Sequence, residues 1–202
     1  MWTTTINRIL KSFLAPVADP RGSLERFVTR IIFLGNLQDR MIYRSLPAPI
    51  DHILLVCTGN ICRSPLAAAY ISARLTKIGR TYTVQSAGLE TSPGKPAHPL
   101  AILVAKRHGL CLDRHATKPL SAAMVKQAHL ILVMELSQRT LLLKRYPEAT
   151  GKVFVLGHFD GVVPLEITDP YNGTEEDFEK CYELIRLSSD RLLDRIQTHS
   201  YE

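Results

Sequence analysis

The 202-residue chain lacks long hydrophobic runs, glycine-rich nucleotide-binding motifs and a dense set of cysteines. No stretch approaches the roughly 18 apolar residues of a membrane-spanning helix, so the sequence predicts no such helix. Neither G-x-x-x-x-G-K-[ST] nor G-x-G-x-x-G occurs, which leaves nucleotide binding without support. Four cysteines form no disulfide framework, and the beginning of the chain has no continuous apolar signal segment. We therefore expect a cytoplasmic, reducing location.

The charge is uneven along the chain. The whole sequence has 25 Lys and Arg against 19 Asp and Glu, a net charge of +6. Residues 1–50 hold seven of the basic residues and three of the acidic ones, a net +4, which leaves residues 51–202 at +2. Because the larger part is nearly balanced, the sequence argues against nucleic acid as its partner.

A proline-bearing segment at residues 45–49 marks the predicted boundary between a basic N-terminal extension, residues 1–50, and a main domain, residues 51–202. In the extension, apolar residues recur at helical spacing over residues 2–13, and arginines accompany the apolar residues of 24–43. A basic amphipathic helix can lie on an anionic membrane surface or on a partner. We expect a partly helical or disordered extension that makes peripheral membrane contact or docks on the main domain. Its basic, acid-free beginning also suits an organellar transit peptide.

From residue 51 on, apolar runs alternate with helix-forming segments. Strands are expected at residues 52–57, 81–86, 130–134 and 153–156, and helices at 65–77, 99–108, 121–127, 137–145 and 174–197. The first and third strands are continuous apolar runs, as expected when helices cover both faces of a parallel sheet. The alternation predicts an α/β fold, a doubly wound three-layer sandwich with a central four-stranded parallel sheet. Ligands of such folds bind beyond the carboxyl ends of the strands.

One nine-residue segment joins the first strand to the helix that follows it. It reads Cys57-Thr58-Gly59-Asn60-Ile61-Cys62-Arg63-Ser64-Pro65. A loop that opens onto a helix N-terminus offers free backbone N–H groups and the positive end of the helix dipole, which suit a phosphate-sized anion. We expect Ser64 as the N-cap of the helix and Pro65 as its first residue.

Cys57 and Arg63 give this loop its predicted chemistry. The field that binds an anion also stabilises a thiolate, so Cys57 is the expected nucleophile. Arg63 carries a planar guanidinium that can hold two oxygens of one phosphate. Taken alone, Cys57 fits equally well as a buried cysteine at the end of a strand. A nucleophile, an anion cradle and a charge clamp within seven residues together predict phosphoryl transfer through cysteine.

The complete segment resembles the signature of the low-molecular-weight protein tyrosine phosphatases, C-x-G-N-x-C-R-S-P, and every fixed position is present. The resemblance covers about residues 51–200 and is closest in pattern to the bacterial branch associated with exopolysaccharide production and export. Outside the loop it rests on residues 86–89, 109–116, 130–134 and 156–160. It implies a phosphatase that acts on a phosphotyrosine protein, the tyrosine-rich tail of a membrane tyrosine kinase. Many animal members have an aromatic residue in the loop after the second strand, whereas residues 89–96 contain none.

The resemblance also assigns roles within the loop. The expected phosphate-binding residues are Thr58, Gly59, Asn60, Ile61, Cys62, Arg63 and Ser64. Asn60 holds the shape of the loop, helped by the tolerance of asparagine for left-handed backbone, and Ser86 hydrogen-bonds to it. Ser64 can donate to the Cys57 thiolate. Cys62 is either a reversible disulfide partner that protects Cys57 from over-oxidation or a small filler.

A carboxylic acid must protonate the leaving phenolate and then activate the water that clears Cys57. The 19 carboxylates of the chain give no physical ground for choosing one. The family carries Asp-Pro and an aromatic residue on a late loop, and Asp169-Pro170-Tyr171 matches this pattern. The resemblance implies that Asp169 is the acid and that Tyr171 forms one wall of a slot for a flat aromatic substrate. A simple turn and a half-exposed loop tyrosine are the alternatives.

Three other functions are open from the sequence. Protein-arginine phosphatases of the same fold resemble C-T-G-N-T-C-R-S-P, with threonine where this chain has Ile61, and a larger apolar side chain there favours an aryl phosphate. A thioredoxin-coupled arsenate reductase needs a downstream cysteine pair, whereas only Cys111 lies in that region. A non-catalytic phosphate-reading adaptor is disfavoured because Cys57, Arg63 and Asp169 are all intact.

The cysteines and histidines predict no metal site. Cys57 and Cys62 would need two further ligands to bind zinc, but the other two cysteines are isolated and the seven histidines have no metal-binding spacing. Cys181 falls on the apolar stripe of the last predicted helix and is expected in the core. His115 and His158 are expected to make structural hydrogen bonds. We expect neither a metal nor an organic cofactor.

Overall fold

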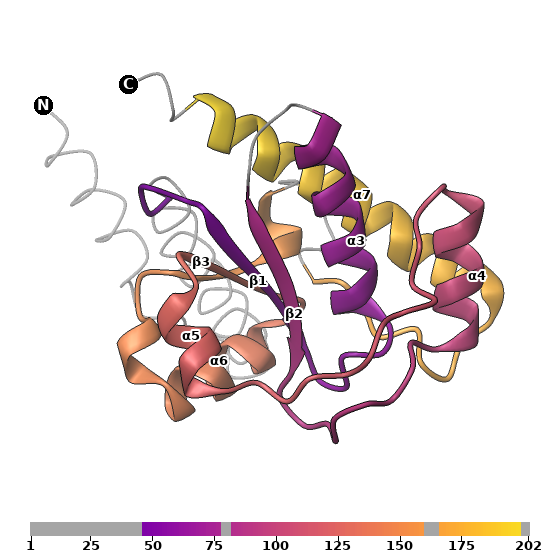
Figure 1. The fold of residues 1–202 in the computed structure, drawn as a ribbon, viewed down its shortest axis with the longest axis horizontal. Helices are drawn as coiled ribbons and strands as arrows, with labels where there is room; N and C mark the ends of the chain where they lie inside the picture. The colour runs from indigo at the N-terminus through magenta and orange to yellow at the C-terminus, as the bar shows by residue number, and fades with distance from the viewer. Residues whose placement is uncertain (1–45, 78–81, 160–165, 199–202) are drawn as a thin grey trace, which may run out of the picture. The chain divides into compact units, whose positions relative to one another are not determined.

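The computed structural model describes residues 46–77, 82–159 and 166–198 (Figure 1). The extension predicted for residues 1–50 lies almost wholly outside these ranges, so its helices and its membrane contact stay predictions. Within the three ranges, no helix combines the length and the apolar composition that crossing a membrane requires.

Four parallel strands form the centre of the described domain. They are β1 (His52–Cys57), β2 (Thr83–Gly88), β3 (Leu130–Val133) and β4 (Val153–Val155), and they lie in the order β2-β1-β3-β4. The chain therefore moves from β1 to a neighbour on one side and later returns to β3 on the other side. A doubly wound sheet places its ligand site where the strand order reverses in this way, at the carboxyl end of β1.

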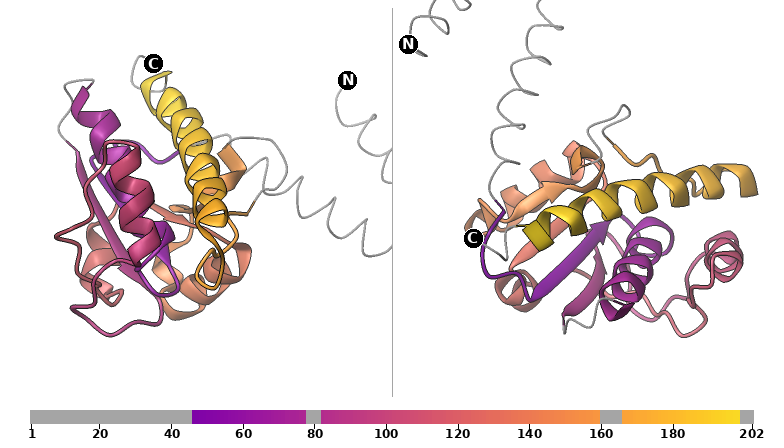
Figure 2. Two further views of the ribbon diagram at one scale, coloured as in Figure 1. Left: turned by 90° about the vertical axis from the view of Figure 1, so that its right-hand side faces the viewer. Right: turned by 90° about the horizontal axis from the view of Figure 1, so that it is seen from above.

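Helices cover both faces of the sheet, which confirms the predicted three-layer sandwich (Figures 1 and 2). One layer contains α3 (Arg63–Lys77), α4 (Pro99–Arg107) and α7 (Glu175–Thr198), with α7 packed against the other two. The opposite layer contains α5 (Ala122–Gln127) and α6 (Leu136–Arg145). Two short 3-10 helices flank β4, namely η1 (Pro147–Ala149) and η2 (Leu156–Phe159).

The central strand β1 is buried from both sides. Leu54 and Val56 pack in one apolar cluster with Val125 of α5 and Leu142 of α6. The intervening residues of β1 are buried as well, and they point to the opposite face because side chains alternate along a strand. This double burial explains why the sequence of β1 is a continuous apolar run and not an alternating pattern.

The predicted element boundaries differ from the structure at two places near the site. β2 lies two residues later than expected, because Ala87 and Gly88 continue the pairing with the end of β1. Helix α3 begins at Arg63, so the predictions of Ser64 as N-cap and Pro65 as first helical residue are wrong. Proline is tolerated at the third position because the first four N–H groups of a helix have no intrahelical partner. The Ser64 hydroxyl is used in the site instead.

Candidate active site

Cys57 ends β1 and is almost fully buried. Its sulfur lies 3.0 Å from the Ser64 hydroxyl and accepts a hydrogen bond from the backbone N–H of Asn60 at 3.2 Å. Donors directed at the sulfur stabilise a thiolate, which is the nucleophilic form of cysteine. The hydroxyl contact is the one the resemblance implied, and the early start of α3 turns Ser64 toward Cys57.

Asn60 fixes the shape of the loop from its interior. Its backbone has the expected left-handed conformation, with φ of 54°. The buried side-chain amide donates to the hydroxyls of Ser64 and Ser86, both at 2.9 Å, and its oxygen accepts from the backbone N–H of Lys118 at 2.9 Å. The bond to Ser86 is the one expected from the sequence. Because both amide protons and the oxygen are bonded, changing the loop conformation would leave buried polar groups unpaired.

Two further residues help the loop to keep this shape, His115 by a hydrogen bond and Gly88 by its lack of a side chain. His115 Nε2 donates to the backbone carbonyl of Asn60 at 2.7 Å, as expected of a structural hydrogen-bonder. Burial lowers the pKa of His115 although this bond acts in the opposite direction. Gly88 leaves room for the loop, since a Cβ there would lie 2.7 Å from the Thr91 side chain and 3.0 Å from the Thr58 carbonyl. Any side chain at position 88 would force these neighbours to move.

Arg63 is 1% exposed and is surrounded by acidic and carbonyl oxygens. Its guanidinium contacts the carboxylates of Glu135 and Asp169 and donates to the Ile167 carbonyl at 3.1 Å. Burial alone would lower the pKa of Arg63, but the negative charges of Asp169 and Cys57 and the bond to Glu135 outweigh it and raise the pKa. The arginine therefore stays charged, as a buried cation can when it is paired and hydrogen-bonded.

Glu135 was missed by the sequence reasoning. It directly precedes α6, close behind the end of β3, and holds Arg63 through one side of the guanidinium. The one signal in the sequence was a carboxylate directly after a predicted strand, and only the observed strand order places it at the same edge of the sheet as Cys57. Gln138 was missed too: its amide accepts from Met134 N at 3.0 Å and donates to the Thr58 hydroxyl at 3.2 Å.

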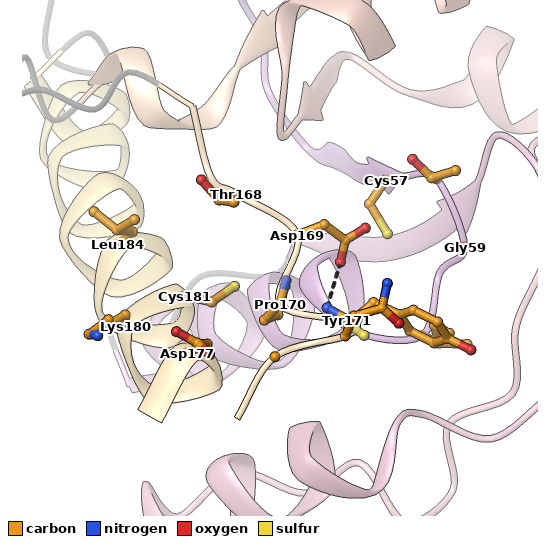
Figure 3. A pocket seen from close by; sticks show the side chains of 15 residues that line it. Cys57, Gly59, Thr168, Asp169, Pro170, Tyr171, Asp177, Lys180, Cys181 and Leu184 are labelled. Atoms are coloured by element: carbon orange, nitrogen blue, oxygen red, sulfur yellow. Dashed lines mark hydrogen bonds between the residues drawn. The ribbon is translucent and has the colours of Figure 1, made fainter. Parts of the chain in front are cut away.

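The loop of Asp169 and Tyr171 lies across the site from β1. Figure 3 shows the side chains of Cys57 and Asp169 pointing toward one another, the first from the end of β1 and the second from the segment that precedes α7. The backbone N–H of Tyr171 donates to Asp169 Oδ1 at 3.3 Å, and the Tyr171 side chain is half exposed. The structure thus brings Cys57 and Arg63 of the first loop together with Asp169 and Tyr171, which lie more than 100 residues later in the chain.

Cys57, Asp169 and Tyr171 line one pocket of about 710 Å³ (Figure 3). One side of the pocket is formed by loop residues Cys57, Thr58, Gly59, Ile61 and Cys62. The other side is formed by residues 168–173 and by Asp177, Lys180, Cys181 and Leu184 of α7.

Two further cysteines line the pocket as neutral thiols. Burial, followed by the charge of Asp169, raises the pKa of the Cys62 thiol, and burial raises the pKa of the Cys181 thiol to about 12. Both remain thiols at neutral pH. Among the described residues, no three histidine, cysteine or carboxylate side chains are grouped so that they could hold a metal ion.

The fold and the site define a class: α/β proteins with a buried cysteine, its sulfur in contact with a hydroxyl and a backbone N–H, in the loop between the first strand of the sheet and the helix that follows it. The family model described as low molecular weight phosphotyrosine protein phosphatase matches residues 52–201. The chain belongs to this family, and the resemblance seen in the sequence is confirmed.

Three relatives of the chain, one known by its sequence and two by their solved structures, match about three quarters of it. A probable low molecular weight protein-tyrosine-phosphatase, EpsP of Ralstonia nicotianae, is 38% identical over 148 residues, which cover 73% of this chain and 97% of EpsP. The tyrosine phosphatase Wzb of Escherichia coli K30, solved in complex with sulphate, is 36% identical with a TM-score of 0.66, covering 72% of this chain and 98% of Wzb. The YwlE arginine phosphatase of Geobacillus stearothermophilus is 32% identical with a TM-score of 0.69, covering 76% of this chain and 96% of YwlE. The fold alone therefore does not separate tyrosine from arginine phosphatases.

Proposed function

We propose that the protein hydrolyses phosphotyrosine in proteins through a phosphocysteine on Cys57, with no metal or organic cofactor. The observation that carries the proposal is the meeting of the buried Cys57 sulfur, held by Ser64 and Asn60, with Asp169 on the facing wall of one pocket. Both side chains point into this pocket, so a phosphate bound between them could be attacked by the sulfur and have its leaving group protonated by Asp169.

In the first step the Cys57 thiolate attacks phosphorus, forming the S–P bond as the P–O bond to the tyrosine breaks. Asp169, released from Arg63 by the bound phosphate and protonated from solvent, gives its proton to the leaving phenolate oxygen. The backbone N–H groups of residues 58–63 and the Arg63 guanidinium hold the three equatorial oxygens, most tightly when their charge is greatest in the transition state.

Arg63 has a free donor for this purpose. Among the described residues its Nε is a buried donor without a hydrogen-bond partner, and Nε shares one edge of the planar group with Nη2, which contacts Asp169. A phosphate with two oxygens on this edge would satisfy Nε and release Asp169 to face the leaving group. Glu135 would keep its contact on Nη1 and hold the guanidinium in place.

In the second step the Asp169 carboxylate takes a proton from a water molecule, whose oxygen attacks the phosphorus of the phosphocysteine. The S–P bond breaks, inorganic phosphate leaves and the thiolate returns to its contacts with Ser64 and the Asn60 N–H. Every proton and electron pair is accounted for by these residues and water.

The pocket favours an aryl phosphate over phosphoarginine. Ile61 and Tyr171 both line it, and a pocket with an apolar side chain and a half-exposed aromatic ring suits a flat phenyl group. EpsP and Wzb, which are named as tyrosine phosphatases, are more similar in sequence than the arginine phosphatase YwlE. From the family resemblance we further propose a membrane tyrosine kinase of exopolysaccharide production or export as the substrate, in the cytoplasm.

The test is hydrolysis of a phosphotyrosine peptide and a phosphoarginine peptide in the presence of a metal chelator, with Cys57→Ser as the control. We expect turnover of phosphotyrosine that chelation leaves unchanged and that the control abolishes. Turnover of phosphoarginine alone would overturn the substrate assignment. Loss of activity on chelation would overturn the cofactor-free mechanism.

The basic extension carries a separate proposal, that residues 1–50 bring the enzyme to an anionic membrane. Its support is the net charge of +4 and the helical spacing of apolar residues in that segment. Co-sedimentation with vesicles that contain anionic lipid compares the full chain with residues 51–202. Equal, negligible binding of both proteins would overturn this proposal and leave the catalytic one untouched.

A further inference from the structure

His98 connects the phosphate loop to the wall that faces it. Its backbone N–H donates to the Ile61 carbonyl at 2.8 Å, so it is tied to the loop. It is also the N-cap of α4, where its ring nitrogen Nδ1 accepts from the backbone N–H of Leu100 at 3.2 Å. These two bonds fix both the main chain of His98 and the orientation of its ring.

The ring of His98 lies between a buried and an exposed aromatic side chain. It stacks on Phe178 of α7, with centroids 4.8 Å apart and planes at 18°. It meets Tyr171 edge-on, with centroids 5.6 Å apart and planes at 69°. Phe178 is fully buried, whereas Tyr171 is 51% exposed. The buried ring therefore anchors His98, and His98 in turn supports the exposed ring.

Tyr171 needs such support if it is to act as a wall. A half-exposed side chain on a loop samples several rotamers, and ordering it when a ligand binds costs conformational entropy. Among the described residues, His98 is the aromatic ring in contact with Tyr171. Because the same residue holds the Ile61 carbonyl, His98 contacts two of the residues that line the pocket, Ile61 through its backbone and Tyr171 through its ring.

We propose that His98 is a positioning residue that holds Tyr171 as the wall of an aryl-binding slot and thereby selects aryl phosphates. This inference rests on the proposed function, since it needs a substrate with an aromatic ring next to the phosphate. His98 acts through Tyr171 and Ile61 and takes no part in the chemistry at phosphorus.

Two substitutions separate the positioning role from the capping role. His98→Asn keeps an acceptor suited to the N-cap of α4 and removes the ring. His98→Phe keeps a flat ring between Phe178 and Tyr171 and removes the acceptor. Both keep the backbone N–H that bonds to Ile61. Thermal unfolding of both variants reports the structural cost of each change independently of binding.

The measurement is the affinity of the full-length protein for phenylphosphonate and for inorganic phosphate, by calorimetry. We expect His98→Asn to weaken phenylphosphonate binding by about threefold to tenfold, the range of aromatic pair contacts. His98→Phe should stay within about twofold of wild type, since its ring still contacts Tyr171. Inorganic phosphate should bind equally to all three proteins, because it does not reach Tyr171.

Three outcomes would overturn the proposal, and they differ in what else they affect. Equal affinities of wild type and His98→Asn for phenylphosphonate, with phosphotyrosine turnover intact, would remove only the role of His98. Loss of affinity for both ligands in His98→Phe, with His98→Asn unchanged, would reduce His98 to a helix cap. A wild-type protein that binds phosphate but gains nothing from the phenyl group would overturn the aryl slot itself, and with it the proposed substrate.

Discussion

Arg63 and Asp169 are in direct contact, so the acid of the proposed mechanism lies on the guanidinium edge that a phosphate would need. An incoming dianion must compete with the Asp169 carboxylate for Arg63, and in doing so it frees the carboxylate to face the leaving group.

Removing the charge of Asp169 should therefore have opposite effects on binding and turnover. We expect Asp169→Asn to bind inorganic phosphate more tightly than wild type, because no carboxylate competes for Arg63. Turnover of a phosphotyrosine peptide should fall about a hundredfold to ten-thousandfold, the usual contribution of a general acid. Calorimetry and steady-state kinetics measure the two effects. Weaker phosphate binding by the variant would contradict the competition.

Glu135 should matter for turnover although it does not face the leaving group. Glu135→Gln loses the charge that holds Arg63 Nη1, so the guanidinium is less well placed for the transition state. We expect kcat/KM for the phosphotyrosine peptide to fall about tenfold to a hundredfold. Glu148→Gln, a change of the same kind at an exposed site on η1, is the matched control and should leave kcat/KM unchanged. Equal kinetics of both variants would show that Asp169 and the loop suffice to hold Arg63.

The interior of the loop should be costly to disturb. Asn60→Ala removes three side-chain hydrogen bonds and places an alanine at a φ of 54°. We expect the free energy of unfolding to fall by about 2–4 kcal/mol, from the lost bonds and the left-handed backbone. Ser86→Ala removes one of these bonds and should cost about 1 kcal/mol. Chemical denaturation measures both, and similar values for the two variants would contradict the central role of Asn60.

The pH dependence of stability should carry a contribution from His115. Its pKa in the folded chain lies below the ordinary value of 6.5, so between the two values the unfolded chain binds the proton more readily. The contribution to stability is complete above about pH 6.5 and is lost as the pH falls through the lower, folded value. His115→Gln keeps a donor for the Asn60 carbonyl but cannot titrate. We expect its free energy of unfolding to fall less steeply than that of wild type below about pH 6.5. Parallel curves would exclude the contribution.

The two thiols of the loop should differ in reactivity. The raised pKa of Cys62 keeps it protonated at neutral pH, so iodoacetamide is expected to modify Cys57 and to spare Cys62. Peptide mapping by mass spectrometry measures the labelling, and preferential labelling of Cys62 would contradict the expectation. The same mapping after peroxide treatment separates the two roles left open for Cys62, since a disulfide partner yields a linked peptide with Cys57 and a filler does not.

The parts of the site that the sequence predicts are those that are contiguous in the chain. The segment from Cys57 to Pro65 contains nucleophile, cradle and clamp within nine residues, so strand, loop and helix follow from local patterns alone. Asp169 could be chosen only through the family resemblance, because nothing local distinguishes it among the carboxylates.

Glu135 and His98 escaped prediction because their roles depend on which elements are neighbours. The order β2-β1-β3-β4 places the end of β3 beside β1, and no periodicity in the chain encodes that order. In the sequence, His98 is simply a residue before a proline at the start of a predicted helix. Only the packing of α4 against α7 places Phe178 and Tyr171 beside its ring. The prediction of Ser64 as N-cap was wrong because α3 already begins at Arg63. The Ser64 hydroxyl contacts the Cys57 sulfur and the Asn60 amide and does not cap the helix.

The anchors of Asn60 have a consequence for the order of events during folding. Ser86, His115 and Lys118 lie 26, 55 and 58 residues along the chain from Asn60. A nascent or partly unfolded chain can form the strand and helix on either side of the loop while these long-range bonds are still missing, because local contacts close fastest. Until β2 and the segment after α4 have docked, nothing holds the left-handed turn at Asn60, and the Asn60 N–H is not fixed against the Cys57 sulfur. The hydrogen bonds around the Cys57 sulfur are thus completed only in the finished fold, and the rate at which a thiol reagent labels Cys57 should change at the last stage of assembly.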